Sequence, residues 1–290
     1  MYARAKINLT LEVLGVRTDG FHDIRSLVVP ISLADEIELR PADGISLDVA
    51  VAPDAASPGS LDRLCPAGEN LAVKAAELLR REAGHAGGVA ISLLKRIPSG
   101  AGLGGGSADA AAVLAGLNGL WGLGLSRERL SELGAGLGSD VPALVLGGPV
   151  LMEGRGERVR REASGAVVNL VLVFPGVFAS TSAVYAKCVP QLTDGRQILD
   201  NMRHALSGGG AEAVAAALHN GLSPAAEALH PEIAQARAAL LAAGACGASM
   251  TGSGSCVFGV MRDADHARMV AADLAQAGYE ARPAHTCPVM

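Results

Sequence analysis

The sequence predicts a chain of two domains that contain both strands and helices. Stretches with the alternation of strands and stretches with helical periodicity both occur along the chain. The chain has 290 residues, half of them hydrophobic, so each of two ordinary domains can bury a core. A charged, turn-rich stretch at residues 154–161 separates two series of elements. We therefore expect domains at residues 1–158 and 159–290.

Composition limits the classes of partner. The net charge of −5 and the pI near 5.8 argue against nucleic acid or an anionic membrane surface as the main partner. Five widely spread cysteines without a C-x-x-C motif suggest neither a disulfide framework nor a zinc site, so a cytoplasmic protein is expected. No signal peptide or membrane-spanning run is evident. Only four of the 24 basic residues are lysines, so a lysine in an apolar setting is a candidate functional residue.

The first expected element is a strand at residues 5–14. Its odd-numbered apolar residues share one face, and Lys6, Asn8, Thr10 and Glu12 share the other. Lys6 and Asn8 therefore project together. An ordinary solvated face explains this pattern as well as a functional one does.

The other elements follow from the same periodicities and from cap residues. Strands are expected within residues 26–39 and at 45–51, 89–97, 167–174 and 256–260; helices are expected at 70–83, 108–120, 126–134, 197–206, 212–221, 231–243 and 265–277. Gly84 suits the end of the first helix, and Ser126 suits the start of another. Residues 52–66, which contain three prolines, are expected to form a surface loop.

A glycine-rich loop, P-S-G-A-G-L-G-G-G-S-A-D-A at residues 98–110, lies between an expected strand and an expected helix. Glycine loses much conformational entropy on ordering, so such a loop indicates that a ligand approaches the backbone closely. Unpaired N–H groups and the helix dipole at a helix start bind anions. The loop predicted to bind phosphate comprises Pro98, Ser99, Gly100, Ala101, Gly102, Leu103, Gly104, Gly105, Gly106, Ser107 and Ala108.

Two familiar phosphate loops do not fit this stretch. A Walker A loop would place a lysine where Gly106 stands, and a Rossmann unit would need a further strand that ends in an acidic residue. A merely tight turn remains the alternative. If the helix starts near Ser107, Asp109 lies in its first turn.

Two further segments interrupt the periodic pattern. In L-G-S-D-V-P, at residues 137–142, Asp140 is either a helix N-cap or a functional acid, and the local pattern favours the cap. In M-T-G-S-G-S-C, at residues 250–256, a second glycine-rich turn leads into a strand. Two glycine loops, one in each expected domain, are expected to face each other.

These three segments occur in the order found in the GHMP kinases, the family of galactokinase, homoserine kinase and mevalonate kinase, and the chain resembles that family over nearly its whole length. A-K-I-N-L at residues 5–9 and G-V-R-T-D-G-F-H at residues 15–22 resemble the branch that phosphorylates the 2-hydroxyl of 4-diphosphocytidyl-2-C-methyl-D-erythritol in non-mevalonate isoprenoid biosynthesis. Another GHMP kinase, acting on homoserine or mevalonate, and a non-catalytic nucleotide-binding module are the alternatives.

The resemblance implies a two-domain α/β (α+β) fold. Its N-terminal domain would be similar to the second domain of ribosomal protein S5, and its C-terminal domain would be ferredoxin-like. It implies ATP as phosphoryl donor, with Mg²⁺ on the phosphates, and a small cytidyl-linked alcohol as the other ligand. It also implies that Lys6 and Asp140 are the catalytic pair. The sequence leaves a monomer and a homodimer equally open.

The resemblance also implies binding residues. Asn70 would lie near the adenine, although it could equally be an N-cap; the substrate would contact Asn8, Phe21, His22, Tyr185, Gly252, Ser253 and Gly254. His22 would read the edge of the cytosine, and the rings of Phe21 and Tyr185 would stack on the two faces of the base. The chain departs from the family pattern where Phe21 replaces a common tyrosine, where Arg4 replaces a proline, and where the segment before Tyr185 lacks a proline.

Overall fold

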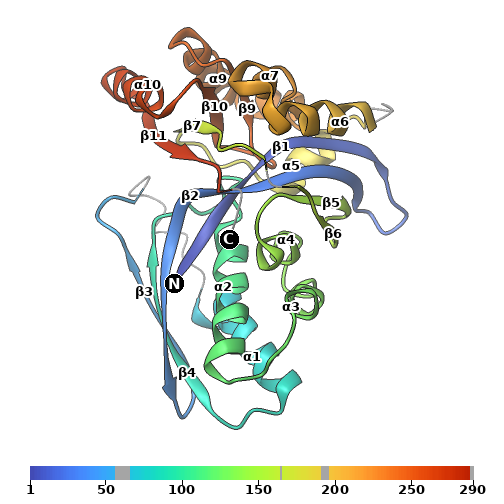
Figure 1. Ribbon diagram of the computed structural model, residues 1–290, viewed down its shortest axis with the longest axis vertical. Helices are drawn as coiled ribbons and strands as arrows, with labels where there is room; N and C mark the ends of the chain where they lie inside the picture. The colour runs from blue at the N-terminus through green and yellow to red at the C-terminus, as the bar shows by residue number, and fades with distance from the viewer. Residues whose placement is uncertain (56–65, 164, 191–195, 288–290) are drawn as a thin grey trace. The chain divides into compact units, whose positions relative to one another are not determined.

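The computed structural model describes residues 1–55, 66–163, 165–190 and 196–287, and most of the surface loop expected at residues 52–66 lies outside these ranges. The chain divides into two compact units, each assembled from three stretches (Figure 1). Unit 1 contains residues 1–5, 33–99 and 104–147, and unit 2 contains residues 6–32, 100–103 and 148–290. The domain boundary expected at residue 158 stays a prediction.

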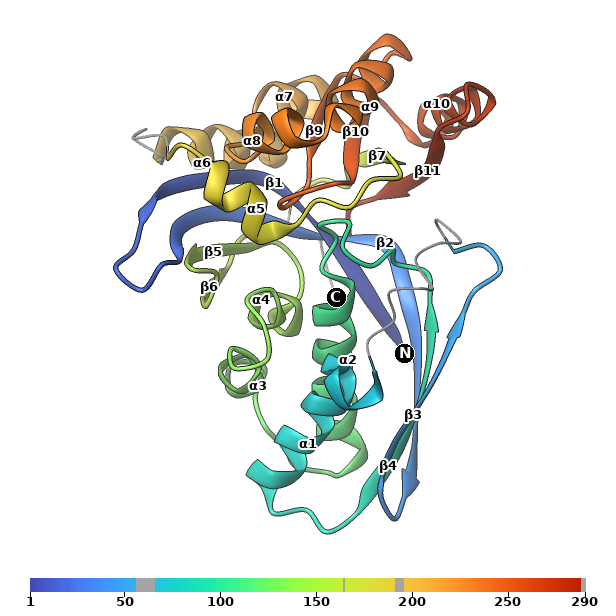
Figure 2. The same cartoon turned by 180° about the vertical axis from the view of Figure 1, so that it is seen from behind.

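Unit 1 combines a β-sheet with a group of helices. Strand β3 (Ile45–Val51) pairs in parallel with β4 (Gly88–Lys95), which pairs antiparallel with residues 36–42 of β2 (His22–Ala42). Helices α1 (Leu71–Ala83) and α2 (Gly105–Leu120) pack against each other, and α3 (Arg127–Gly134) and α4 (Val141–Leu146) pack beside α2 (Figure 2). A 3₁₀ turn, η2 (Ala67–Glu69), precedes α1.

The cap residues of unit 1 act as the sequence predicts. The side chain of Asn70 caps α1 by accepting a hydrogen bond from the Ala72 amide at 2.9 Å. Gly84 ends α1 in the left-handed region at φ +60°. Ser126 caps α3 by accepting from the Arg129 amide at 3.1 Å. Local capping chemistry therefore sets three helix ends in this unit.

Unit 2 contains parts of both sheets. Strand β1 (Tyr2–Val16), whose residues from Lys6 onward belong here, pairs in parallel with the short β8 (His219–Asn220). Residues 24–28 of β2 pair with β5 (Val150–Gly154), which pairs with β6 (Arg158–Arg161). A second, antiparallel sheet has the order β11-β7-β10-β9; these strands are β7 (Asn169–Phe174), β9 (Gly247–Met250), β10 (Val257–Met261) and β11 (Glu280–His285).

Helices pack against this second sheet. Helix α7 (Gly210–Ala216) packs on β9 and β10, α9 (Pro231–Ala242) packs on the same two strands, and α10 (Ala264–Gln276) packs on β7 and β11 (Figure 1). The unit also contains α5 (Thr181–Lys187), α6 (Arg196–His204), the π-helical segment η3 (Ala205–Gly209) and α8 (Ser223–Leu229). The helix expected at residues 212–221 is therefore shorter than predicted, because its last residues pair with β1 as β8.

Both faces of β1 are buried, which the alternating pattern did not reveal. The apolar residues Leu11 and Val13 join a core cluster with β7, α9 and α10. The polar side chains of the other face, from Lys6 to Glu12, are at most 3% exposed. This polar face is therefore not the solvated surface that the pattern allowed.

Among the described residues, Cys188, Cys246, Cys256 and Cys287 are free thiols. In the part of the chain that the structure describes, no helix combines the length and the apolar character needed to cross a bilayer.

Candidate functional site

The first part of the glycine-rich loop needs glycine for its backbone. Gly100, Gly102 and Gly104 have φ values of +71°, +77° and +70°, in the left-handed region that glycine populates readily. At Gly102 space is also restricted, since a Cβ there would lie 2.2 Å from the Thr251 carbonyl oxygen. The two glycine loops thus meet at this point within unit 2, although we expected them to belong to different domains.

The second part of the loop is the start of α2, one turn earlier than predicted. The helix begins at Gly105, and its first backbone bond runs from the Ala108 amide to the Gly104 carbonyl at 2.8 Å. The N-cap residue, Gly104, has no side chain that could cap the amides of the first turn. This helix start therefore has the donors and the dipole that an anion needs, and the phosphate role of residues 98–108 stays a prediction that fits this geometry.

Lys6 projects toward both glycine loops. Its ammonium donates to the Asn8 amide oxygen at 2.8 Å and to the Gly102 carbonyl at 2.9 Å. The side chain is nearly inaccessible, at 3% exposed. A Cβ at Gly252, in the second loop, would lie 3.4 Å from the same ammonium. The positive charge of Lys6 is therefore held within unit 2 where the two loops meet.

Asn8 joins β1 to the second glycine loop. Its amide oxygen accepts from the Gly252 amide at 2.9 Å and from the Thr251 hydroxyl at 3.2 Å, as well as from Lys6. Its amide nitrogen donates to the Ser26 hydroxyl at 2.7 Å. The Asn8 oxygen thus orients the Lys6 ammonium and the Gly252 backbone together.

Residues 250–255 are supported from further elements of unit 2. Asn220 donates to the carbonyls of Met250 and Gly252 at 2.7 and 3.0 Å. Ser253, which is 8% exposed, shares a hydrogen bond of 2.9 Å with the Thr181 hydroxyl of α5. The predicted substrate residues 252–254 therefore lie on a loop held by Asn220 and Thr181, and the sequence pattern identified neither of these two residues.

The predicted base-binding residues gather in unit 2. The rings of His22 and Tyr185 lie 4.9 Å apart at an interplanar angle of 46°. Phe21 is 51% exposed, and the guanidinium carbon of Arg155 lies 5.4 Å from its ring centroid. Gly20 has a φ of +84°, and the Asp19 carboxylate accepts from the Phe21 amide at 3.2 Å, so these two residues shape the turn.

Asp140 occupies the N-cap position of α4 but does not act as a cap. Its side chain makes no capping hydrogen bond, and the carboxylate is half-buried. Two residues earlier, a Cβ at Gly138 would lie 3.5 Å from the Ser107 hydroxyl. The segment that carries Asp140 therefore runs beside the first turn of α2, within unit 1.

A charged cluster in unit 1 was missed by the sequence analysis. Lys95 forms ion pairs with Asp35 and, at 2.7 Å, with Asp109. Asp109 lies in the second turn of α2 instead of the first, because the helix starts at Gly105. Burial, together with the nearby charge of Asp35, raises the pKa of Asp109 to about 7 despite the attraction of Lys95. The scarcity of lysine was the one signal that could have identified this cluster.

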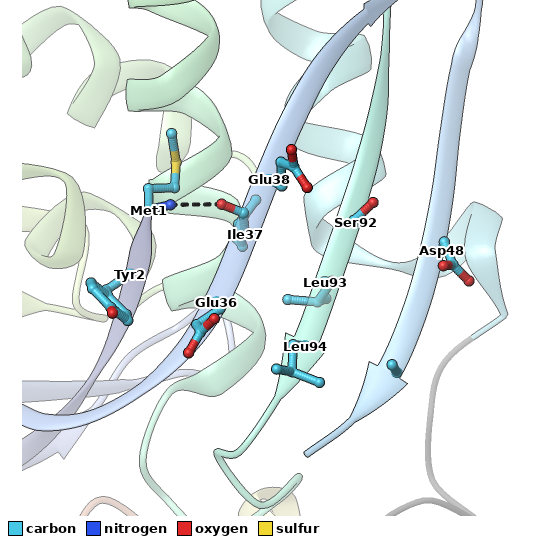
Figure 3. Close-up of a pocket in the computed structure, with 10 residues that line it drawn as sticks. Met1, Tyr2, Glu36, Ile37, Glu38, Asp48, Ser92, Leu93 and Leu94 are labelled. Carbon is cyan, nitrogen blue, oxygen red and sulfur yellow. Dashed lines mark hydrogen bonds between the residues drawn. The ribbon is translucent and has the colours of Figure 1, made fainter.

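A cavity of about 400 Å³ elsewhere in unit 1 contains none of the predicted site residues (Figure 3). It is lined by β2, β3 and β4 and carries the carboxylates of Glu36, Glu38 and Asp48. The Met1 amine there donates to the Ile37 carbonyl at 2.7 Å. Three carboxylates disfavour an anionic ligand, so this cavity is a poor candidate for a phosphate site.

Comparison with known proteins identifies the family. The chain is 46% identical over 272 residues to the 4-diphosphocytidyl-2-C-methyl-D-erythritol kinase of Pelotomaculum thermopropionicum. These residues are 93% of this chain and 91% of that protein. Residues 70–148 match the model of the GHMP kinases N terminal domain, and residues 202–280 match that of the GHMP kinases C terminal domain. The chain belongs to the GHMP kinase family.

Other GHMP kinases support this assignment. The enzyme of the same name from Symbiobacterium thermophilum is 46% identical over 262 residues, which cover 89% of each chain. A crystal structure of a 4-(cytidine 5'-diphospho)-2C-methyl-D-erythritol kinase has a TM-score of 0.79 at 36% identity and covers 99% of this chain and 98% of that chain. Leishmania major mevalonate kinase, at 19% identity and a TM-score of 0.71, covers 99% of this chain and 95% of its own and shares the fold. The predicted two-domain α/β fold is confirmed.

Proposed function

We propose that this GHMP kinase transfers the γ-phosphoryl group of ATP to the 2-hydroxyl of 4-diphosphocytidyl-2-C-methyl-D-erythritol. The identity of 46% to a kinase of that name over 93% of the chain carries the proposal. The adjoining rings of His22 and Tyr185, together with Phe21, which is next to His22 in the sequence, support a binding site for the cytosine. The reaction would serve isoprenoid precursor synthesis in the cytoplasm.

The nucleotide would be held by the glycine-rich loop. Backbone amides at the start of α2 would bind the phosphates, and Asn70, whose side-chain oxygen already caps α1, would lie near the adenine. Mg²⁺ would neutralise charge on the phosphates. Mg²⁺ in sites of this kind is usually held by one or two carboxylates together with the substrate phosphates and water.

Phosphoryl transfer from ATP needs positioning and charge stabilisation more than covalent chemistry. The acceptor hydroxyl must still lose its proton, and the Asp140 carboxylate would accept it as a general base. The Lys6 ammonium, held by Asn8 and the Gly102 carbonyl, would offset the negative charge that develops on the reacting oxygens. Asn8 and residues 252–254 would orient the polyol end of the substrate.

The test of this proposal is product formation from ATP with each acceptor in turn. We expect phosphorylation of the cytidyl alcohol and, at the same enzyme concentration, no product above background from homoserine or mevalonate. Product from homoserine or mevalonate alone would favour another GHMP activity. ATP binding without turnover of any acceptor would favour a non-catalytic module.

His22→Ala is expected to raise the KM for the cytidyl alcohol by about tenfold while leaving the KM for ATP within about twofold. The loss of one base-reading hydrogen bond accounts for a change of this size. Steady-state kinetics with each substrate varied in turn would measure both constants.

His285→Ala, at an exposed position of β11, is the matched control and should change neither constant. Equal losses for both substrates in His22→Ala would contradict a role in reading the base.

A further inference from the structure

Three buried charged side chains, Asp35, Lys95 and Asp109, form one cluster in unit 1. Lys95 donates to a carboxylate oxygen of Asp35 and, at 2.7 Å, to a carboxylate oxygen of Asp109. The three residues are 0%, 8% and 2% exposed. Neither the comparisons nor the proposed chemistry uses any of them, so the cluster needs a separate explanation.

The cluster joins the two ends of the glycine-rich loop. Before the loop, the second carboxylate oxygen of Asp35 accepts from the backbone amides of Arg96 and Ile97, at 2.5 and 2.8 Å. After the loop, Asp109 lies one turn into α2. Lys95 connects these two carboxylates, so the chain before Pro98 and the helix after Gly104 are held through one ammonium.

The Lys95 ammonium also lies close to the first residue of α2. A Cβ at Gly105, the first residue of the helix, would lie 3.6 Å from the Lys95 ammonium and 3.0 Å from the Ile97 side chain. Lys95 and Ile97 therefore lie close to the first residue of the helix, whose backbone amides are part of the predicted phosphate site.

Stability alone is a weak reason for such a cluster. A buried ion pair gains little over apolar residues of the same volume, because its desolvation offsets most of its attraction. Here two carboxylates share one ammonium, and Asp109 Oδ1 has no hydrogen-bond partner among the described residues. Apolar side chains would stabilise the core at least as well. Ionic hydrogen bonds, which are directional, hold the joined backbone segments in one arrangement better than apolar contacts do.

We infer that Asp35, Lys95 and Asp109 are positioning residues that set the spacing of the two ends of the glycine-rich loop for the phosphates of ATP. This inference rests on the proposed nucleotide role of the loop. The three residues touch no ligand in this role and act through the backbone that they hold.

Asp109→Asn tests the inference with the smallest change of shape. The variant keeps the side-chain volume but removes the charge that pairs with Lys95. We expect the Kd for ATP, measured by calorimetry without an acceptor, to rise about tenfold, equivalent to about 1.4 kcal/mol. The KM for the cytidyl alcohol should stay within about twofold, a split that a general loss of stability would not produce.

Val113→Ala is the matched control, because Val113 is buried on the same helix one turn beyond Asp109 and belongs neither to the loop nor to the charged cluster. It should lower the melting temperature with an unchanged Kd for ATP. An unchanged Kd in a folded Asp109→Asn variant would overturn the inference.

A second variant separates folding from positioning. Asp35→Asn/Lys95→Met/Asp109→Leu removes all three buried charges together and keeps a side-chain oxygen at position 35 that can accept from the Arg96 and Ile97 amides, so the protein should fold. ATP should nevertheless bind at least about tenfold more weakly. Wild-type affinity in this folded variant would overturn the inference even if Asp109→Asn failed to fold.

The calorimetric readout keeps the two proposals distinguishable. If the wild type binds ATP but phosphorylates none of the acceptors, the proposed function fails and the positioning inference is still decided by the variants. If the wild type does not bind ATP, the inference fails with the role of the loop.

Discussion

Asp140→Asn is expected to lower kcat by about 10²- to 10⁴-fold, the usual contribution of a general base. Asparagine has nearly the same shape but cannot accept the proton of the acceptor hydroxyl. The Asp140 side chain makes no capping bond to α4, so the substitution removes no helix cap. The Kd for ATP should therefore stay within about threefold. Turnover under saturating substrates and calorimetry with ATP would measure the two effects.

Ser139→Ala is the control for this prediction, because Ser139 is the exposed neighbour of Asp140. It should leave kcat within about twofold, as surface substitutions usually do. Unchanged turnover in Asp140→Asn would rule out the assignment of this carboxylate as the base.

Gly102→Ala is expected to destabilise the protein by about 2–5 kcal/mol and to abolish most activity. Alanine at φ +77° costs about 1–3 kcal/mol, and its Cβ would lie 2.2 Å from the Thr251 carbonyl oxygen, so the two loops must separate at further cost. Separation would also move the Gly102 carbonyl away from the Lys6 ammonium. Thermal unfolding and steady-state kinetics would measure both effects.

Gly119→Ala provides the matched control within α2. Gly119 is helical, and a Cβ there meets nothing within 4 Å. The substitution should stabilise the protein by up to about 1 kcal/mol without a change in activity. A Gly102→Ala variant as stable and active as Gly119→Ala would show that the contact between the loops is dispensable.

Local rules predicted the helix ends well where one residue decides the geometry. Asn70, Gly84 and Ser126 cap their helices as expected, because capping depends on neighbours within a few positions. The start of α2 was placed too late because glycine disfavours helix interiors. The left-handed Gly104 directs the chain into the helix at Gly105 despite that low propensity.

Environment was harder to predict than local shape. Alternation placed Lys6 and Asn8 on one face of β1 correctly, and they do hydrogen-bond. It could not show that this face is buried, since its partners include residues far away in the sequence, such as Gly102, 96 positions from Lys6, and Thr251, 243 positions from Asn8. The ion pair of Asp35 with Lys95 likewise spans 60 positions. Pairings of this kind depend on tertiary packing, which no periodicity encodes.

The interrupted course of the chain has a practical consequence for dissecting this kinase. Because each compact unit is assembled from three stretches, no single cleavage can release either of them intact. A fragment ending at residue 147 would retain residues 6–32 but lack β5 and β8, with which they pair. Isolating unit 1, the half that we propose to bind the nucleotide, would require rejoining its pieces in a new order, and a nick by a protease should leave two parts that stay associated.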